Sequence, residues 1–160
     1  MNLRLLTKPL VAILLLSALA CSKKDAPAAS SDATGSYQLD SAPISCQAKA
    51  STSTVSSGGV SVDYLIIDLL TTPQPATGAE TLRLYFAKPK VQSNNTYTLT
   101  DITLENRGST VAHYFTTDAA TLTTTSNGVF SGTFSGKNFF AATSGPYTAV
   151  TNGKFTNVRP

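Results

Sequence analysis

The chain has 160 residues, of which 41% are hydrophobic and 13% are charged, and its formal net charge is +3. A chain of this length builds one domain around a single core. Lysine and arginine are not clustered, and without residues 1–20 ten basic residues stand against nine acidic ones, a net charge of +1. A near-neutral chain without a basic cluster lacks the electrostatic footprint of a nucleic-acid-binding protein, so this class is excluded.

The first twenty residues have the pattern of an export signal. Arg4 and Lys8 supply the positive start, and an apolar run extends from Leu10 to Ala20, directly before Cys21. As a helix this run spans about 16 Å, against about 30 Å of hydrocarbon in a bilayer, so it is too short for a stable transmembrane segment. We expect residues 1–20 to be a signal peptide that is cleaved before Cys21.

The residues at the expected cleavage site, Ala18-Leu19-Ala20-Cys21, resemble a bacterial lipobox. The resemblance implies a lipoprotein, in which the Cys21 thiol receives a diacylglycerol and the new amine is acylated, for instance by palmitate. Each buried methylene contributes about 0.8 kcal/mol, so two or three acyl chains anchor a protein where one chain does not. A plain secretory signal followed by a coincidental cysteine is the alternative.

Residues 21–34 are expected to form a flexible tether behind the lipidated cysteine. They contain no aromatic residue, and a chain of this kind has a reach of about 20 Å. The start of the tether, Cys21-Ser22-Lys23-Lys24-Asp25, resembles that of many Bacteroidota lipoproteins. This resemblance implies the outer membrane, with the protein on the cell surface or on the periplasmic face.

Beyond residue 34 the chain is rich in Thr, Ser, Val, Tyr and Phe and has frequent turn residues, which indicates β-strands. The segment Ile44–Ala50 alternates between apolar and polar residues, so Cys46 and Ala48 are predicted to face the core. The following Ser57-Gly58-Gly59 predicts a turn.

The segment Val60–Thr71 is predicted to be a central strand, because the continuous apolar run Tyr64–Ile67 suggests burial on both faces or a bulge. A helix is the weaker alternative. In the next strand, Thr81–Phe86, every second residue is apolar, and Lys88-Pro89-Lys90 is expected to end it, because proline cannot donate to the ladder.

Three further strands are predicted toward the C-terminus, with an Asn106-Arg107-Gly108 turn between the first two. They are Asn95–Leu104, Thr110–Thr117 and Ala120–Thr125. Ser126-Asn127-Gly128 and Thr151-Asn152-Gly153 predict hairpins, because Asn-Gly supplies the two positive φ angles of a type I′ turn.

Two segments, 128–136 and 150–155, resemble the closing part of short Bacteroidota lipoproteins whose β domain has no assigned function. The resemblance implies that Asn152-Gly153 makes a turn, and it implies no activity. It also implies that three phenylalanines face the core: Phe130, Phe134 and Phe155.

The expected fold is all-β: a single antiparallel β-sandwich domain over residues 35–160, with about eight or nine strands, behind the signal peptide and the tether. An up-and-down β-barrel is the alternative. A closed barrel would hold a small apolar ligand in its interior.

The residues with catalytic chemistry are few. His113 is the only histidine and shares a face with Phe115, while Cys46 is in phase with Ile44 and Ala48, so both are expected to be structural. A hydrolase that uses Cys46 as a nucleophile and His113 as its base is the less favoured alternative.

The carboxylates show no pairing geometry. Asp63 and Asp68 are predicted to point to opposite faces of one strand, and Asp101 and Glu105 share a face at a distance of about 13 Å, too far for a glycosidase pair from one strand. We expect no enzyme, no catalytic residue, no metal site and no cofactor.

Two features are candidates for binding or modification. An exposed aromatic patch is predicted from Tyr85, Tyr114, Phe139 and Phe140. Asp40-Ser41-Ala42 resembles the O-glycosylation site of exported Bacteroidota proteins, which implies Ser41 as the acceptor.

We therefore expect a lipid-anchored, noncatalytic envelope or cell-surface lipoprotein that binds a partner or has a structural role. Its partners are the membrane, through the lipid on Cys21, and an envelope protein or a surface glycan. A lipocalin-like binder of a small apolar ligand and the Cys46-His113 hydrolase are the alternatives.

Overall fold

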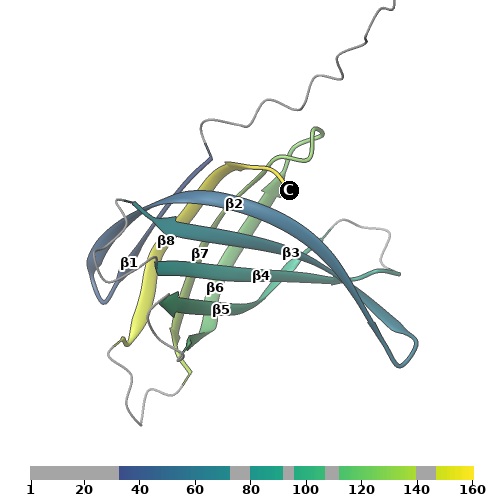
Figure 1. The fold of residues 1–160 in the computed structure, drawn as a ribbon, viewed down its shortest axis with the longest axis horizontal. Coiled ribbons are helices and arrows are strands. Elements are labelled where there is room, and N and C mark those ends of the chain that lie inside the picture. Colours follow the sequence, from purple (N-terminus) through teal and green to yellow (C-terminus); the bar gives the residue numbers. More distant parts are fainter. Residues whose placement is uncertain (1–32, 73–79, 92–95, 107–111, 140–146) are drawn as a thin grey trace, which may run out of the picture.

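The computed structural model describes residues 33–72, 80–91, 96–106, 112–139 and 147–160. Within these residues eight antiparallel strands form a closed barrel in chain order, and β8 pairs with β1 (Figure 1). The strands are β1 (Thr34–Leu39), β2 (Ala42–Ser57), β3 (Val60–Thr71), β4 (Glu80–Pro89), β5 (Thr98–Asn106), β6 (His113–Thr124), β7 (Phe130–Asn138) and β8 (Ala149–Val158). The expected signal peptide, Cys21, the tether up to residue 32 and Phe140 lie outside the described residues.

The all-β class is confirmed, and the barrel that the sequence left open as the alternative replaces the favoured sandwich. A sandwich has open sheet edges, whereas β1 here pairs with β2 on one side and with β8 on the other. β3, β4 and β5 run across β6, β7 and β8 at a steep angle (Figure 1). Both architectures bury one face of each strand, so they share an alternating pattern, and only the pairing of the first and last strands separates them.

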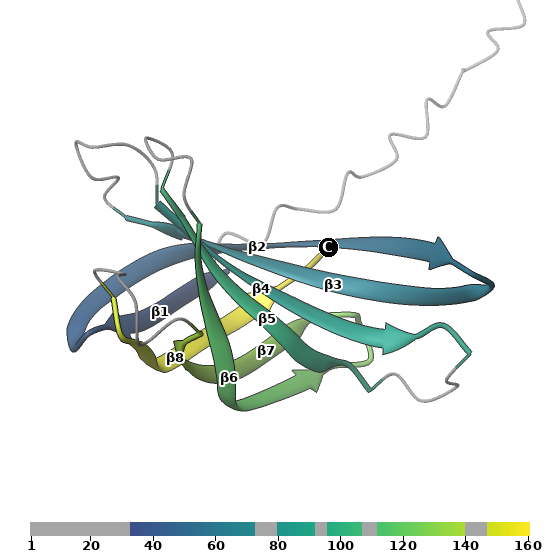
Figure 2. The same cartoon turned by 90° about the horizontal axis from the view of Figure 1, so that it is seen from below.

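The N-terminal half follows the predicted strands. β3 spans Val60–Thr71 and is a strand, not a helix. Gly58 and Gly59 have φ angles of 57° and 80°, the left-handed pair that a type I′ turn requires. The hairpin that they close extends beyond the rest of the barrel (Figure 2). β4 ends at Pro89, as predicted.

β6 corrects the prediction of two strands, Thr110–Thr117 and Ala120–Thr125. It is a single strand, and its register with β7 shifts between Thr117 and Ala119. The extra residue at this bulge reverses which side chains face the interior: Phe115 is buried before it, and Leu122 is the inward residue after it. A reversal of phase looks like the end of a strand in the sequence.

The two Asn-Gly hairpins also need correction. Ser126-Asn127-Gly128 does connect β6 to β7, but only Gly128 has a positive φ (69°), and its N–H donates to the carbonyl of Thr125 at 3.0 Å. This is a type I turn with a left-handed glycine, not a type I′ turn.

Asn152-Gly153 is not a turn at all. Both residues lie inside β8, and the ladders to β1 and β7 both shift register near Asn152, whose φ is 51°. The left-handed conformation that Asn tolerates makes a bulge here, because β8 is hydrogen-bonded on both sides and continues through it.

The interior of the barrel is filled by side chains from opposite walls. The rings of Phe86 on β4 and Phe155 on β8 meet edge to face, with their centroids 6.0 Å apart. Tyr37 on β1 donates its hydroxyl to Glu80 Oε1 on β4 at 3.2 Å. The predicted core residues Leu82, Leu84, Phe86, Phe130, Phe134 and Phe155 are all buried. Opposite walls of the barrel are therefore in contact where Phe86 meets Phe155.

Candidate functional site

Cys46 is placed as an inert core thiol. Its residue is 4% exposed, and it lies opposite Gly35 on β1 and Thr71 on β3. Burial, with a smaller contribution from the charge of Glu80, raises the pKa of Cys46 to about 12. The thiol is therefore protonated at neutral pH, and a protonated thiol is a poor nucleophile.

The neighbours of His113 are different from those of Cys46. It lies opposite Leu104 on β5, and its ring packs edge to face on Tyr147 with the centroids 5.3 Å apart. Cys46 and His113 thus belong to different parts of the barrel wall, which gives no support to a nucleophile and base pair. The absence of catalysis stays a prediction.

The carboxylates of β3 point to opposite faces, as predicted, and have structural partners. Asp63 accepts a hydrogen bond from Thr54 Oγ1 at 2.8 Å. Asp68 and Glu105 both bind Arg83 on the outer face, at 2.7 and 3.1 Å. Within the described residues, no group of three or more His, Cys, Asp or Glu side chains could hold a metal ion.

Three of the four residues of the predicted aromatic patch lie among the described residues, and they line grooves on the outer face of the barrel. Tyr85 and Tyr114 line one groove of about 440 Å³, and Tyr114 and Phe139 line a second groove of about 410 Å³. Tyr64 also lines the first groove. We call Tyr64, Tyr85, Tyr114 and Phe139 the aromatic surface.

Tyr64 was not predicted as part of the patch, because the apolar run Tyr64–Ile67 suggested burial on both faces. In β3 only Leu65 and Ile67 of this run are buried, and Tyr64 and Ile66 are partly exposed on the outer face. The signal was present in the sequence: Tyr64 is in phase with Asp68, a residue expected outside.

Strand register places the aromatic surface. Ile66 on β3 is opposite Tyr85 on β4, and Tyr85 is opposite Asp101 on β5. Tyr114 lies opposite Thr103, two residues further along β5. The N–H of Phe139 donates to the carbonyl of Tyr114 at 3.0 Å, which keeps the two aromatic residues adjacent.

Two side chains of the aromatic surface are well exposed. Tyr114 is 50% exposed and Phe139 is 66% exposed. Both grooves lie beside the short β5–β6 ladder, in which Ile102, Thr103 and Leu104 pair with β6. The ladder ends at the pair of Ile102 and Phe115, and beyond this end Thr100 and Thr116 line the second groove.

Asp101 is the charged group that both grooves share. It is exposed, and in the part of the chain that the structure describes no basic side chain pairs with it. The nearby Arg83 is already held between Asp68 and Glu105. The site thus offers aromatic rings around a carboxylate that lacks a cation, an arrangement that suits a positively charged group.

Ser41, the candidate glycosylation site, lies at the tip of the β1–β2 hairpin and is exposed. Asp40 and Ser41 have φ angles of 48° and 74°, which forms a type I′ turn. Asp40 Oδ1 accepts hydrogen bonds from Thr148 N, Thr148 Oγ1 and Ala149 N at 2.8, 2.6 and 2.9 Å. Asp40 therefore has a structural role of its own, and modification of Ser41 stays a prediction.

Within the described residues, no helix has the length and apolar character needed to cross a membrane. No protein-family model matches the chain, and no curated protein or solved structure is significantly similar to it.

Proposed function

We propose that this protein is a noncatalytic binding module, held at the bacterial outer membrane by a lipid on Cys21, whose aromatic surface docks a basic segment of another envelope protein. The observation that carries this proposal is Asp101, an exposed carboxylate shared by two grooves that Tyr85, Tyr114 and Phe139 line.

The chemistry of the site selects the partner. A lysine or arginine over a tyrosine ring contributes about 0.5–2 kcal/mol, depending on desolvation. The Asp101 carboxylate adds a charge-assisted hydrogen bond to the same cation. Aromatic residues are enriched in the buried centres of protein interfaces, and Tyr114 and Phe139 have the exposed area to form one.

The expected tether suits this role. Twelve residues separate Cys21 from Thr34, where β1 begins. A flexible segment of this length has a root-mean-square reach of about 20 Å, enough to hold the barrel clear of lipid headgroups while it rotates toward a partner.

The outer face is a better candidate for the binding site than the barrel interior. A barrel is compatible with a lipocalin-like binder, but Phe86 and Phe155 meet across the interior, and residues that fill a barrel leave little room for a ligand. A hydrolase would need Cys46 as a thiolate, which its burial opposes.

Defined peptides test the proposal. We would titrate the purified full-length chain in detergent with peptides that carry one arginine between apolar residues, and with the same peptides carrying alanine. We expect saturable binding of the arginine peptides alone, weakened about tenfold or more by Asp101→Asn.

The matched control is Asp118→Asn, which removes an exposed carboxylate from β6 that pairs with Lys137 at 3.2 Å. Equal affinity for arginine and alanine peptides, or equal losses in the two variants, would reject the assignment of this surface. A photo-crosslinker at position 139 would then be used on intact cells to identify the natural partner.

A further inference from the structure

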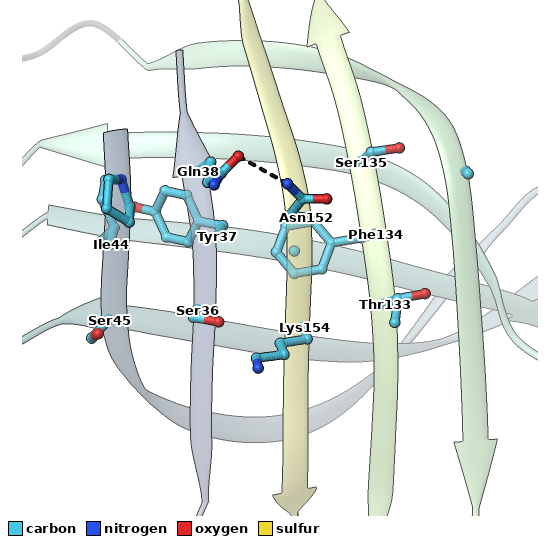
Figure 3. Close-up of a pocket in the computed structure, with 13 residues that line it drawn as sticks. Ser36, Tyr37, Gln38, Ile44, Ser45, Thr133, Phe134, Ser135, Asn152 and Lys154 are labelled. Atoms are coloured by element: carbon cyan, nitrogen blue, oxygen red, sulfur yellow. Dashed lines mark hydrogen bonds between the residues drawn. The ribbon is translucent and has the colours of Figure 1, made fainter. Parts of the chain in front are cut away.

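A third groove lies on the outer face of the barrel half formed by β2, β1, β8 and β7 (Figure 3). It has a volume of about 630 Å³. We call it the polar groove, after the outward side chains that border it: Ser36, Gln38, Ser45, Thr133, Ser135, Asn152 and Lys154. It shares no lining residue with the aromatic surface.

A row of polar side chains crosses the strands along this groove. Ser36 is opposite Ser45 on one side and Lys154 on the other, and Lys154 is opposite Thr133. Strands lie about 4.8 Å apart, so a row over four strands spans about 14 Å. Such a row presents hydrogen-bonding groups at regular intervals to an extended ligand.

The bulge in β8 completes the groove beside this row. It turns Asn152 toward Gln38, and Asn152 Nδ2 donates to Gln38 Oε1 at 2.9 Å (Figure 3). The pair leaves the Gln38 amide N–H groups and the Asn152 side-chain carbonyl for a ligand. A donor and an acceptor held side by side match two adjacent hydroxyl groups of a sugar.

Charge defines the ligand further. Lys154 is the cation of the groove, and none of the described residues that line it carries a carboxylate. In the described part of the chain, no acidic side chain forms an ion pair with Lys154. The groove is therefore complementary to an anion, whereas the aromatic surface around Asp101 is complementary to a cation.

The composition of the groove favours a glycan over a protein. Protein interfaces are enriched in aromatic residues and depleted in serine and lysine. Seven of the residues that line this groove are serine, threonine, amide or lysine residues, and apolar residues such as Pro43 and Ile44 also line it. We propose that the polar groove binds an acidic oligosaccharide, with a sugar carboxylate at Lys154 and ring hydroxyl groups at Gln38 and Asn152.

Oligogalacturonate, a chain of uronic acid units, is a suitable probe, with a neutral maltooligosaccharide of equal length as its control. Calorimetric titration of the full-length chain should show saturable binding of the acidic sugar alone. Lys154→Gln should weaken it about tenfold or more. Asn152→Gly should weaken it too, and because glycine accepts a positive φ, the bulge is kept.

The charge-matched control is Lys90→Gln, an exposed residue directly after β4. Binding that survives in Lys90→Gln and falls in the two groove variants supports the proposal. No saturable binding of the acidic sugar, equal binding of the neutral sugar, or equal losses in Lys154→Gln and Lys90→Gln would each overturn it. Asp101→Asn should leave sugar binding unchanged, which separates this result from the peptide-docking proposal.

Discussion

Gly153 is a position where a single added methyl group should strongly destabilise the barrel. A Cβ added there would lie 2.5 Å from Phe134 Cζ and 2.6 Å from Phe134 Cδ2. Carbon atoms pack best at about 3.5–4.0 Å, so the ring would have to move by about 1 Å. Phe134 is buried, and its surroundings leave little room for that movement.

We therefore expect Gly153→Ala to lower the free energy of unfolding by about 3 kcal/mol, the upper end of the usual range for overpacking. In a domain of this size, that loss corresponds to a fall in Tm of about 10 °C. Urea unfolding followed by circular dichroism measures the change, and an unchanged m-value would show that the unfolded state is unaffected.

A double-mutant cycle tests the cause. Phe134→Leu removes the ring that the new methyl group meets, so Gly153→Ala should cost at least about 1 kcal/mol less in the Phe134→Leu background. Gly128→Ala is the control, because no atom lies within 4 Å of the added Cβ and only its φ of 69° is unfavourable, a cost of about 1 kcal/mol. An equal cost of Gly153→Ala in both backgrounds would refute the steric explanation.

Three other predictions follow from single side chains. Cys21→Ala should abolish labelling by a palmitate analogue and leave unprocessed precursor; equal labelling would contradict the lipid anchor. Cys46 should react with a thiol reagent only when the protein unfolds. Burial raises the pKa of Cys46 from 9.0 to about 12, so above about pH 9 the free energy of unfolding should fall more in the wild type than in Cys46→Ala. Hydrogen bonds, chiefly from the Thr148 hydroxyl, lower the pKa of Asp40. The contribution of Asp40 to the free energy of unfolding is therefore present above its ordinary pKa of 3.8 and is lost as the pH falls through the lowered pKa. In urea unfolding, the stability of Asp40→Asn should depend less on pH in acid than that of the wild type.

The period-2 pattern predicted which side chains face the interior wherever a strand is regular. Leu82, Leu84 and Phe86 are buried as expected, as are Cys46 and Ala48. The Gly58-Gly59 turn was also predictable from the chain alone, because a left-handed backbone is a local requirement that glycine meets at little cost. Tyr85, Tyr114 and Phe139 were candidates for a surface because phase and the Phe139-Phe140 pair are visible in the chain.

Features that depend on pairing between distant strands were not predictable. Asn152-Gly153 has the local pattern of a hairpin, yet it forms a bulge, because β1 and β7 hold β8 on both sides. The bulge in β6 reverses the phase within a continuous strand, so the strand looked like two.

The sequence by itself determined the strand class, the inward faces and the tight turn between β2 and β3, because each depends on neighbouring residues along the chain. Only the tertiary structure decided that the sheet closes, since β1 must meet β8 from the other end of the domain. It also decided which surface side chains share a groove: Asp101 joins Tyr85 and Tyr114, and Lys154 joins Ser36 and Thr133, through register across strands that no local pattern specifies.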